Sequence, residues 1–274
     1  MAKAQEKTAN AAPAESTEVG PVDMSMARPD WLPKDSYIGT EGIGKEDARL
    51  PRIALAQKGT PEADPDDPRY IEGIIPGTFF NSLTKDVLAN KTTPILFTII
   101  RQDKPRWIEF IPMLEGGGVR DFDVKIGDPR TKFTKGQDGK SVPPLATKFY
   151  EWVVVIKFGG TMIPVGLSMK GMSLKTALDL NGLILNRRAD LFAGVYELNR
   201  APEKNAKGSY FIYTVKNAGW VSRDLYATFK SLYETFKDKE VSIDREQMGE
   251  EPDDSMAASG DGDGGDTEFG TESM

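Results

Sequence analysis

The chain has 274 residues, of which 39% are hydrophobic, enough for a folded core with polar ends. It has no cysteine and no histidine, which excludes disulfide frameworks, thiolate zinc sites, cysteine nucleophiles and enzymes that depend on a histidine base. A G-x-x-x-x-G-K-[ST] phosphate loop is also absent. The composition therefore favours a binding protein over an enzyme, and we expect no metal or other cofactor.

The net charge of −7 conceals an asymmetry. Residues 246–274 hold ten acidic side chains and no Lys or Arg. Residues 1–245 hold all 35 basic and 32 of the 42 acidic side chains, a net charge of +3. A mildly basic body thus carries an acidic C-terminal strip. No apolar run reaches the roughly 18 residues of a membrane span, and the first residues lack the layout of a signal peptide, so we expect no membrane association and a cytoplasmic location.

Three regions are predicted along the chain. Residues 1 to about 30 hold few large apolar side chains and cannot bury enough surface to order themselves. We therefore expect 1–48 to be disordered or extended, 49–240 to form the folded domain, and 241–274 to be a flexible acidic tail. The domain begins with the strand-like run "RLPRIALAQKG" (49–59), which a Pro/Asp loop follows at 60–70.

Alternation of apolar and polar residues then predicts strands at 94–101, 105–112, 148–158, 161–169, 191–198 and 208–216. The first two are separated by "QDK" and should form a hairpin, and "NRAPEKNAK" (199–207) should be a loop. Helical spacing appears over 173–190 and again over 221–239. The second helix has an apolar stripe that should pack on the body, formed by Leu225, Phe229, Leu232 and Phe236.

This order predicts a mainly β protein with flanking helices (α+β), arranged as an elaborated OB-like Greek-key barrel. The helix at 173–189 would lie between the third and fourth strands, as in OB folds, and 221–239 would be a C-terminal packing helix. The proposed barrel strands are 94–101, 105–112, a long bent strand over 148–169, 191–198 and 208–216.

Charged residues mark the outer face of a strand, and residues of the same parity share that face. By this rule one aromatic on each of three strands lies on the polar face: Trp107, Phe149 and Tyr210. The Gly- and Lys-rich stretch 115–147 adds Phe122 and Phe133 among basic residues.

Exposed rings beside basic side chains are typical of proteins that bind single-stranded nucleic acid, because bases stack on the rings and cations follow the phosphates. We predict single-stranded DNA contacts by Arg101, Lys104, Arg106, Trp107, Phe122, Lys125, Arg130, Lys132, Phe133, Lys135, Lys140, Lys148, Phe149, Tyr210 and Lys216. In the alternative interpretation, the N-terminal segment or the last helix covers the rings, and the lysines form an ordinary solvated face.

The tail "SGDGDGGDTEFG" (259–270) joins acidic residues to one phenylalanine. An acidic strip on a flexible tether stays near the basic groove at high effective concentration, so it can occupy the groove until DNA displaces it. The displaced tip could then bind partner proteins through Asp261, Asp263, Asp266, Glu268 and Phe269. The alternative is a tail that only confers solubility.

Four stretches of the chain resemble a known class of proteins: "PRIALAQKG", "GTFFNSLTKDVL" (77–88), residues 191–222 and the tail. In these the chain resembles the single-stranded DNA-binding proteins of bacteriophages, in which an OB-like barrel precedes an acidic tail with a terminal aromatic. The resemblance implies coating of single strands during phage replication or recombination in the host cytoplasm. It implies a replicative polymerase, a primase–helicase or a recombinase as tail partner, and it leaves homo-oligomerisation open. Phe269 lies five residues before the end, a departure from tails that are read at their terminus.

Two other functions stay open. Asp121 and Asp123 flank Phe122 and could form the two-carboxylate Mg²⁺ site of a nuclease, although no Glu-x-Lys motif follows. A virion or scaffolding protein would also explain the polar termini and the packing helix. It would be disfavoured if the basic residues of 115–148 and the three strand aromatics formed one continuous surface.

Overall fold

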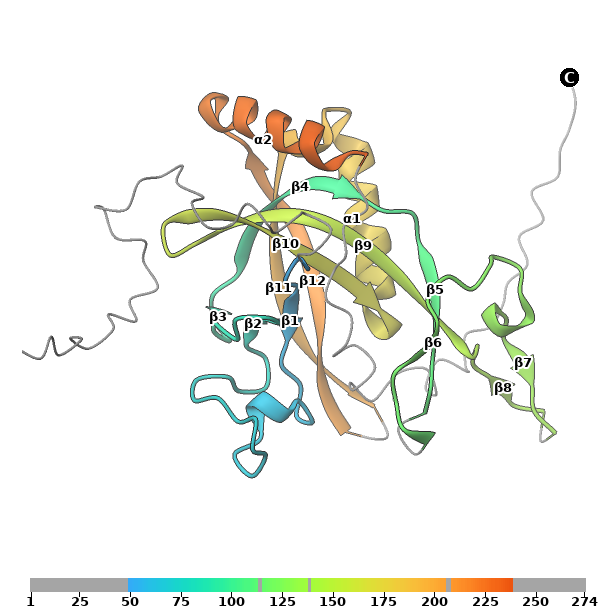
Figure 1. The fold of residues 1–274 in the computed structure, drawn as a ribbon. Helices are drawn as coiled ribbons and strands as arrows, with labels where there is room; N and C mark the ends of the chain where they lie inside the picture. The colour runs from blue at the N-terminus through green and yellow to red at the C-terminus, as the bar shows by residue number, and fades with distance from the viewer. Residues whose placement is uncertain (1–48, 113–114, 138, 206–207, 239–274) are drawn as a thin grey trace, which may run out of the picture.

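The computed structural model describes residues 49–112, 115–137, 139–205 and 208–238 (Figure 1). These residues form a mainly β fold with two α-helices and antiparallel sheets, which confirms the predicted α+β class. The predicted N-terminal segment 1–48 and the whole predicted tail, 241–274, lie outside the described residues.

The main sheet is organised around β9 (Ala146–Phe158), whose register with its neighbours follows from its apolar alternation. β10 (Thr161–Lys170) pairs with one edge of β9 through a tight turn at Gly159 and Gly160. Tyr150 and Trp152 belong to the alternating set of β9 that faces the barrel interior. The predicted strands 148–158 and 161–169 are thus confirmed to within two residues.

The predicted hairpin of 94–101 with 105–112 is wrong. β4 (Ile95–Gln102) and β5 (Arg106–Phe110) both pair with the edge of β9 opposite β10, and no ladder joins them to each other in the described residues. The chain does not reverse at "QDK" because the Asp103 N–H donates to the Glu151 carbonyl at 3.0 Å, which keeps the backbone on β9. Pro105 has no N–H to donate, so it interrupts the ladder without turning the chain.

β11 (Gly194–Asn205) and β12 (Gly208–Trp220) form a long hairpin, and β11 pairs with β4. Five strands therefore lie in the order β10-β9-β4-β11-β12, and α1 (Leu174–Arg187) comes between β10 and β11 along the chain. This is an OB-like Greek-key order with the expected helix position. The barrel is not closed, because no ladder joins β10 to β12 among the described residues.

Two segments do not form the barrel strands that were predicted for them. Residues 148–169 are two strands instead of one bent strand, and β5 extends the first barrel strand instead of forming the second. The predicted loop 199–207 is also wrong over most of its length, because β11 continues to Asn205. Residues 191–193, predicted as strand, form the 3-10 helix η6 (Leu191–Ala193).

The open seam between β10 and β12 is occupied by β1 (Ile53–Leu55) and α1. β1 lies parallel to β10, where the Gly166 N–H donates to the Pro51 carbonyl at 2.7 Å. On the β12 side the Tyr213 hydroxyl donates to the Ile53 carbonyl at 3.2 Å, and the Thr176 hydroxyl of α1 donates to the Tyr213 carbonyl at 2.6 Å. β1 also forms a small sheet with β2 (Phe79–Asn81) and β3 (Val87–Ala89).

α2 (Arg223–Phe236) covers the outer face of the barrel, as its apolar stripe predicts (Figure 1). The Ser222 side chain caps its first turn by accepting from the Leu225 N–H at 3.4 Å. Phe229 packs against Ile100, Val155 and Phe192. Neither described helix is both long and apolar enough to cross a bilayer.

Candidate nucleic-acid interface

A long excursion between β5 and β9, residues 111–145, leaves the sheet and returns to it; we call it the arm. It holds β6 (Val119–Asp121), the 3-10 helix η4 (Pro129–Thr131), β7 (Thr134–Lys135) and β8 (Ser141–Val142). β6 pairs with β5, and β7 pairs with β8. Figure 1 shows the β7–β8 hairpin reaching away from the body.

The arm presents two aromatic rings to solvent. Phe122 is 54% exposed and Phe133 is 59% exposed. Exposed lysines lie on the same segment: Lys125, Lys132, Lys135 and Lys140. This combination of open rings and cations is what a single strand of nucleic acid binds.

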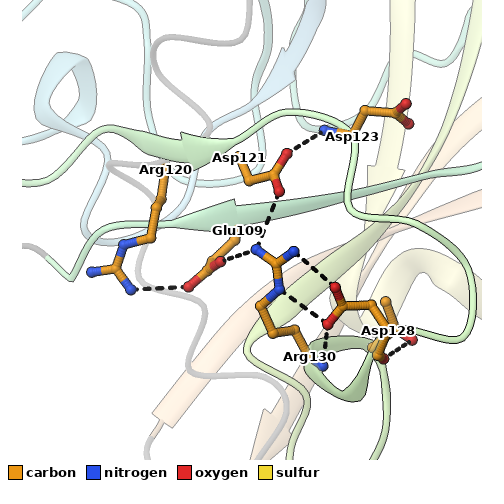
Figure 2. Close-up of polar contacts among 7 residues, drawn as sticks. Glu109, Arg120, Asp121, Asp123, Asp128 and Arg130 are labelled. Carbon is orange, nitrogen blue, oxygen red and sulfur yellow. Dashed lines mark hydrogen bonds and ion pairs between the residues drawn. The ribbon is translucent and has the colours of Figure 1, made fainter.

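The base of the arm is fixed by Arg130, which bonds three carboxylates at once (Figure 2). Its Nη2 and Nε donate to the two oxygens of Asp128, at 2.8 and 3.1 Å. Its Nη1 donates to Glu109 Oε2 at 2.7 Å and to Asp121 Oδ2 at 3.1 Å. One guanidinium thus ties η4 to β5 and β6.

Glu109 is the buried member of this cluster, with 4% of its surface exposed. Its second oxygen, Oε1, accepts from Arg120 Nη1 at 2.9 Å, so each carboxylate oxygen has a cationic donor. Arg120 also reaches Glu115 at 3.3 Å. A buried carboxylate is costly without such partners, so Glu109 holds both arginines against the sheet.

The arginines keep these acids ionised. Hydrogen bonds from the side chain and then the backbone N–H of Arg130 lower the pKa of Asp128 from 3.8 to about 2. The pKa of Glu109 is lowered chiefly by the Arg130 hydrogen bond, with burial opposing and Arg120 assisting. The same contacts raise the pKa of Arg130. The positive charge of Arg130 is therefore already balanced by protein carboxylates at neutral pH.

Residues 22–242, which include every element described above, match the family model of the Pam3 phage gp34-like protein. The chain belongs to this phage protein family. No curated protein and no solved structure matches it. The phage origin implied by the resemblance is confirmed, whereas the binding of single-stranded DNA by this family member stays a prediction.

The prediction that Phe149 is an exposed ring is wrong, because its side chain is 0% exposed. Its ring packs with Ile108 and Val119 and lies 5.9 Å from the Phe110 ring. Parity with Glu151 misled the prediction, since Glu151 is itself buried and accepts a hydrogen bond from Ser168 at 3.3 Å. The arm and β5 cover the face of β9 that holds Phe149, although Glu151 on the same face predicted that it would be exposed to solvent.

Trp107 and Tyr210 are half-buried and lie on different parts of the sheet. Trp107 is on β5, opposite Lys148 of β9, and Tyr210 is on β12, opposite Glu203 of β11. In the sheet order, β11, β4 and β9 separate β12 from β5. The three strand aromatics therefore do not form one exposed row, whereas Phe122 and Phe133 of the arm are exposed.

Several predicted phosphate contacts are engaged within the protein. Arg101 pairs with Asp103 at 2.6 Å and donates to the Phe236 carbonyl at 3.2 Å, which ties down the end of α2. Lys216 pairs with Glu197 at 2.9 Å.

Other predicted cations differ in how freely they are presented. Lys148 lies 4.9 Å from the centre of the Tyr150 ring, and Lys125 pairs with Asp123 at 3.0 Å. Lys104 is exposed and Arg106 is half-buried. Lys132 and Lys135 of the arm are exposed, and neither forms an ion pair with another described residue.

The carboxylates of the nuclease alternative are also engaged. Asp121 accepts from Arg130 and from the Asp123 N–H at 3.0 Å (Figure 2), and Asp123 pairs with Lys125. In the described part of the chain, no group of three or more acidic side chains could hold a metal ion. The predicted tail contacts at 261–269 lie outside the described residues.

Among the described residues, sequence reasoning missed two exposed rings, Tyr70 at 40% exposure and Trp220. Trp220, the last residue of β12, is 59% exposed. The guanidinium carbon of Arg187 lies 4.5 Å from its ring centre. No alternation pattern identifies this ring, because the contact depends on the end of α1 meeting the end of β12.

Proposed function

We propose that this phage protein binds single-stranded DNA and that the arm is its main contact surface. The supporting observation is the placement of two exposed rings, Phe122 and Phe133, on one segment with Lys132 and Lys135. Each stacked base contributes about 1–3 kcal/mol. Lysines that neutralise phosphates add a salt-dependent, sequence-independent term. Sequence-tolerant coating of single strands in replication or recombination needs this combination.

The network around Glu109 supports this assignment because it orders the base of the arm before the ligand arrives. Binding surfaces that are ordered in advance lose less conformational entropy on binding. Arg130 and Arg120 join η4 and β6 to the buried Glu109, so the segment between them is held at both ends. In this proposal Arg130 positions the arm, and the exposed lysines meet the phosphates.

The acidic tail fits the same function as a regulator. Ten acidic residues and no basic one follow residue 245, on the same chain as the basic arm. A tethered acidic segment competes with DNA for the lysines and is displaced when DNA binds. We propose that the free tail then recruits a replicative polymerase, a primase–helicase or a recombinase.

Fluorescence anisotropy of labelled oligo-dT over a salt series tests the function. The full chain is compared with a chain ending at Lys239, and we expect steep weakening with salt and tighter binding after truncation. The double variants Phe122→Ala/Phe133→Ala and Lys132→Gln/Lys135→Gln should each weaken binding. The matched control is Lys230→Gln, an exposed lysine on α2, and should bind as the unmodified chain does. Absence of binding at low salt in all proteins would refute the function.

One observation favours a second candidate function. The arm also exposes three aliphatic side chains, Ile126, Val142 and Leu145. Exposed apolar side chains gathered on one segment mark protein contacts as well as nucleic-acid contacts. A virion or scaffolding protein would use the arm to dock on another subunit. If oligo-dT does not bind and the chain forms oligomers that Ile126→Ser/Leu145→Ser disrupts, the assembly function is the better one.

A further inference from the structure

Trp220 is an exposed ring that the protein holds in place. The guanidinium of Arg187 lies between two rings, with its central carbon 4.8 Å from the centre of Tyr196 and 4.5 Å from the centre of Trp220. Tyr196 is buried, so the stack is anchored in the core. The Arg187 guanidinium lies against the Trp220 ring, and 59% of the Trp220 residue remains exposed to solvent.

Arg187 itself is held by hydrogen bonds to three residues. Its Nη1 donates to the Gly219 carbonyl and its Nη2 to the Val195 carbonyl at 3.0 Å. Nε and Nη2 also donate to Asn217 Oδ1, at 3.2 and 3.0 Å. Every nitrogen of the guanidinium therefore has a partner, so Arg187 serves to orient Trp220.

Two exposed arginines lie close in sequence to the two stacked residues, Arg187 and Trp220. Arg188 follows the stacked arginine, and Arg223 begins α2 three residues after Trp220. Both are exposed, and neither forms an ion pair with another described residue. Arg188 also adopts a left-handed conformation, φ 49°, at the C-terminal cap of α1, where glycine is the residue of lowest cost. An arginine kept in such a conformation suggests a use for its side chain.

We propose that Trp220 stacks a nucleobase of single-stranded DNA and that Arg188 and Arg223 meet the adjoining phosphates. This second contact rests on the proposed function and extends it. An exposed flat ring, with arginines close in sequence to the two stacked residues, suits a base in a phosphate-linked strand better than an aliphatic side chain. The end of β12 lies beneath α2, on the other side of the body from the β7–β8 hairpin (Figure 1). A strand that contacts both places must therefore cross the body.

This separation makes the effect depend on oligonucleotide length. A short oligo-dT of about 6 nucleotides should bind mainly at the arm, whereas one of about 20 should reach both places. Trp220→Ala should weaken binding of the long oligonucleotide about 5- to 150-fold and leave the short one nearly unchanged. Phe122→Ala/Phe133→Ala should weaken both. Leu178→Ala, which removes an exposed leucine from the outer face of α1, is the matched control.

Tryptophan fluorescence gives a second readout. The chain has four tryptophans, so the measurement uses a Trp31→Phe background. Of the remaining three, Trp152 is buried and Trp107 is half-buried, so quenching by stacked thymine should come mainly from Trp220. Trp220→Phe keeps a ring and should retain most of the affinity but lose most of the quenching. If quenching persists in Trp220→Phe, or if Trp220→Ala binds the long oligonucleotide normally, this contact is refuted while the proposed function stands. If the unmodified chain binds neither oligonucleotide, both proposals fail.

Discussion

Replacing Phe149 by alanine should destabilise the fold, whereas the same change at Phe122 or Phe133 should affect DNA binding alone. Phe149 of β9 is fully buried against β5 and β6, where Ile108, Phe110 and Val119 surround its ring. Its removal loses the transfer free energy of the ring and leaves a cavity, a loss of about 3–5 kcal/mol for Phe→Ala in a core. For a domain of this size the melting temperature should fall by about 6–20 °C.

Phe122 and Phe133 lack this burial, so their replacement should change the free energy of unfolding by less than about 0.5 kcal/mol. Each should instead lower the affinity for oligo-dT by about 5- to 150-fold, the equivalent of one lost stacked base. Urea unfolding followed by circular dichroism measures the first quantity, and anisotropy at fixed salt measures the second.

The two measurements together separate structural from binding roles. The controls are Phe149→Leu, which should recover most of the stability, and Phe122→Leu, which should recover little of the affinity because leucine has no π-face. The reasoning is refuted if Phe149→Ala keeps its unfolding midpoint and loses affinity. It is equally refuted if Phe122→Ala and Phe133→Ala unfold early and bind normally once folded.

Three further predictions concern the arm and one glycine. Arg130 lowers the pKa of Asp128 from 3.8 to about 2. The Asp128 carboxylate therefore stabilises the fold above pH 3.8, and this contribution is lost as the pH falls toward 2. Between pH 3.8 and 2, the melting temperature of Arg130→Gln should fall less steeply than that of the unmodified chain. Because Arg130 is balanced by carboxylates, Arg130→Gln should leave the slope of log affinity against log salt unchanged, whereas Lys132→Gln should reduce it by about 0.7 in a salt titration. Gly77 has φ 91° and a Cβ there would lie 3.0 Å from an aromatic ring of β12, so Gly77→Ala should cost about 1–3 kcal/mol by urea unfolding. Gly59→Ala, with no atom within 4 Å of its Cβ, should be nearly neutral.

Local patterns in the sequence were sufficient for much of the fold. Alternation predicted β9 and β10, and helical spacing predicted α1 and the apolar stripe of α2, because the period of a buried face depends on neighbouring residues alone. The place of the helix before the last two strands also followed from the succession of elements, whereas two of the assigned barrel strands were wrong. The exposure of Phe122 and Phe133 was also predictable from local sequence, because the Gly- and Lys-rich stretch around them offers little apolar surface to bury them.

What only the tertiary structure decided is which elements meet. β4 and β5 share one edge of β9 because a backbone bond to Glu151 holds the chain there, a contact that no local period encodes. Phe149 is buried because the arm folds back over a strand face that a charged residue marks as outer. Arg130 looked like a phosphate ligand by its charge, yet it bonds carboxylates from three separate segments. Charge and period are properties of the chain, whereas burial and pairing depend on residues far apart in sequence that packing brings together.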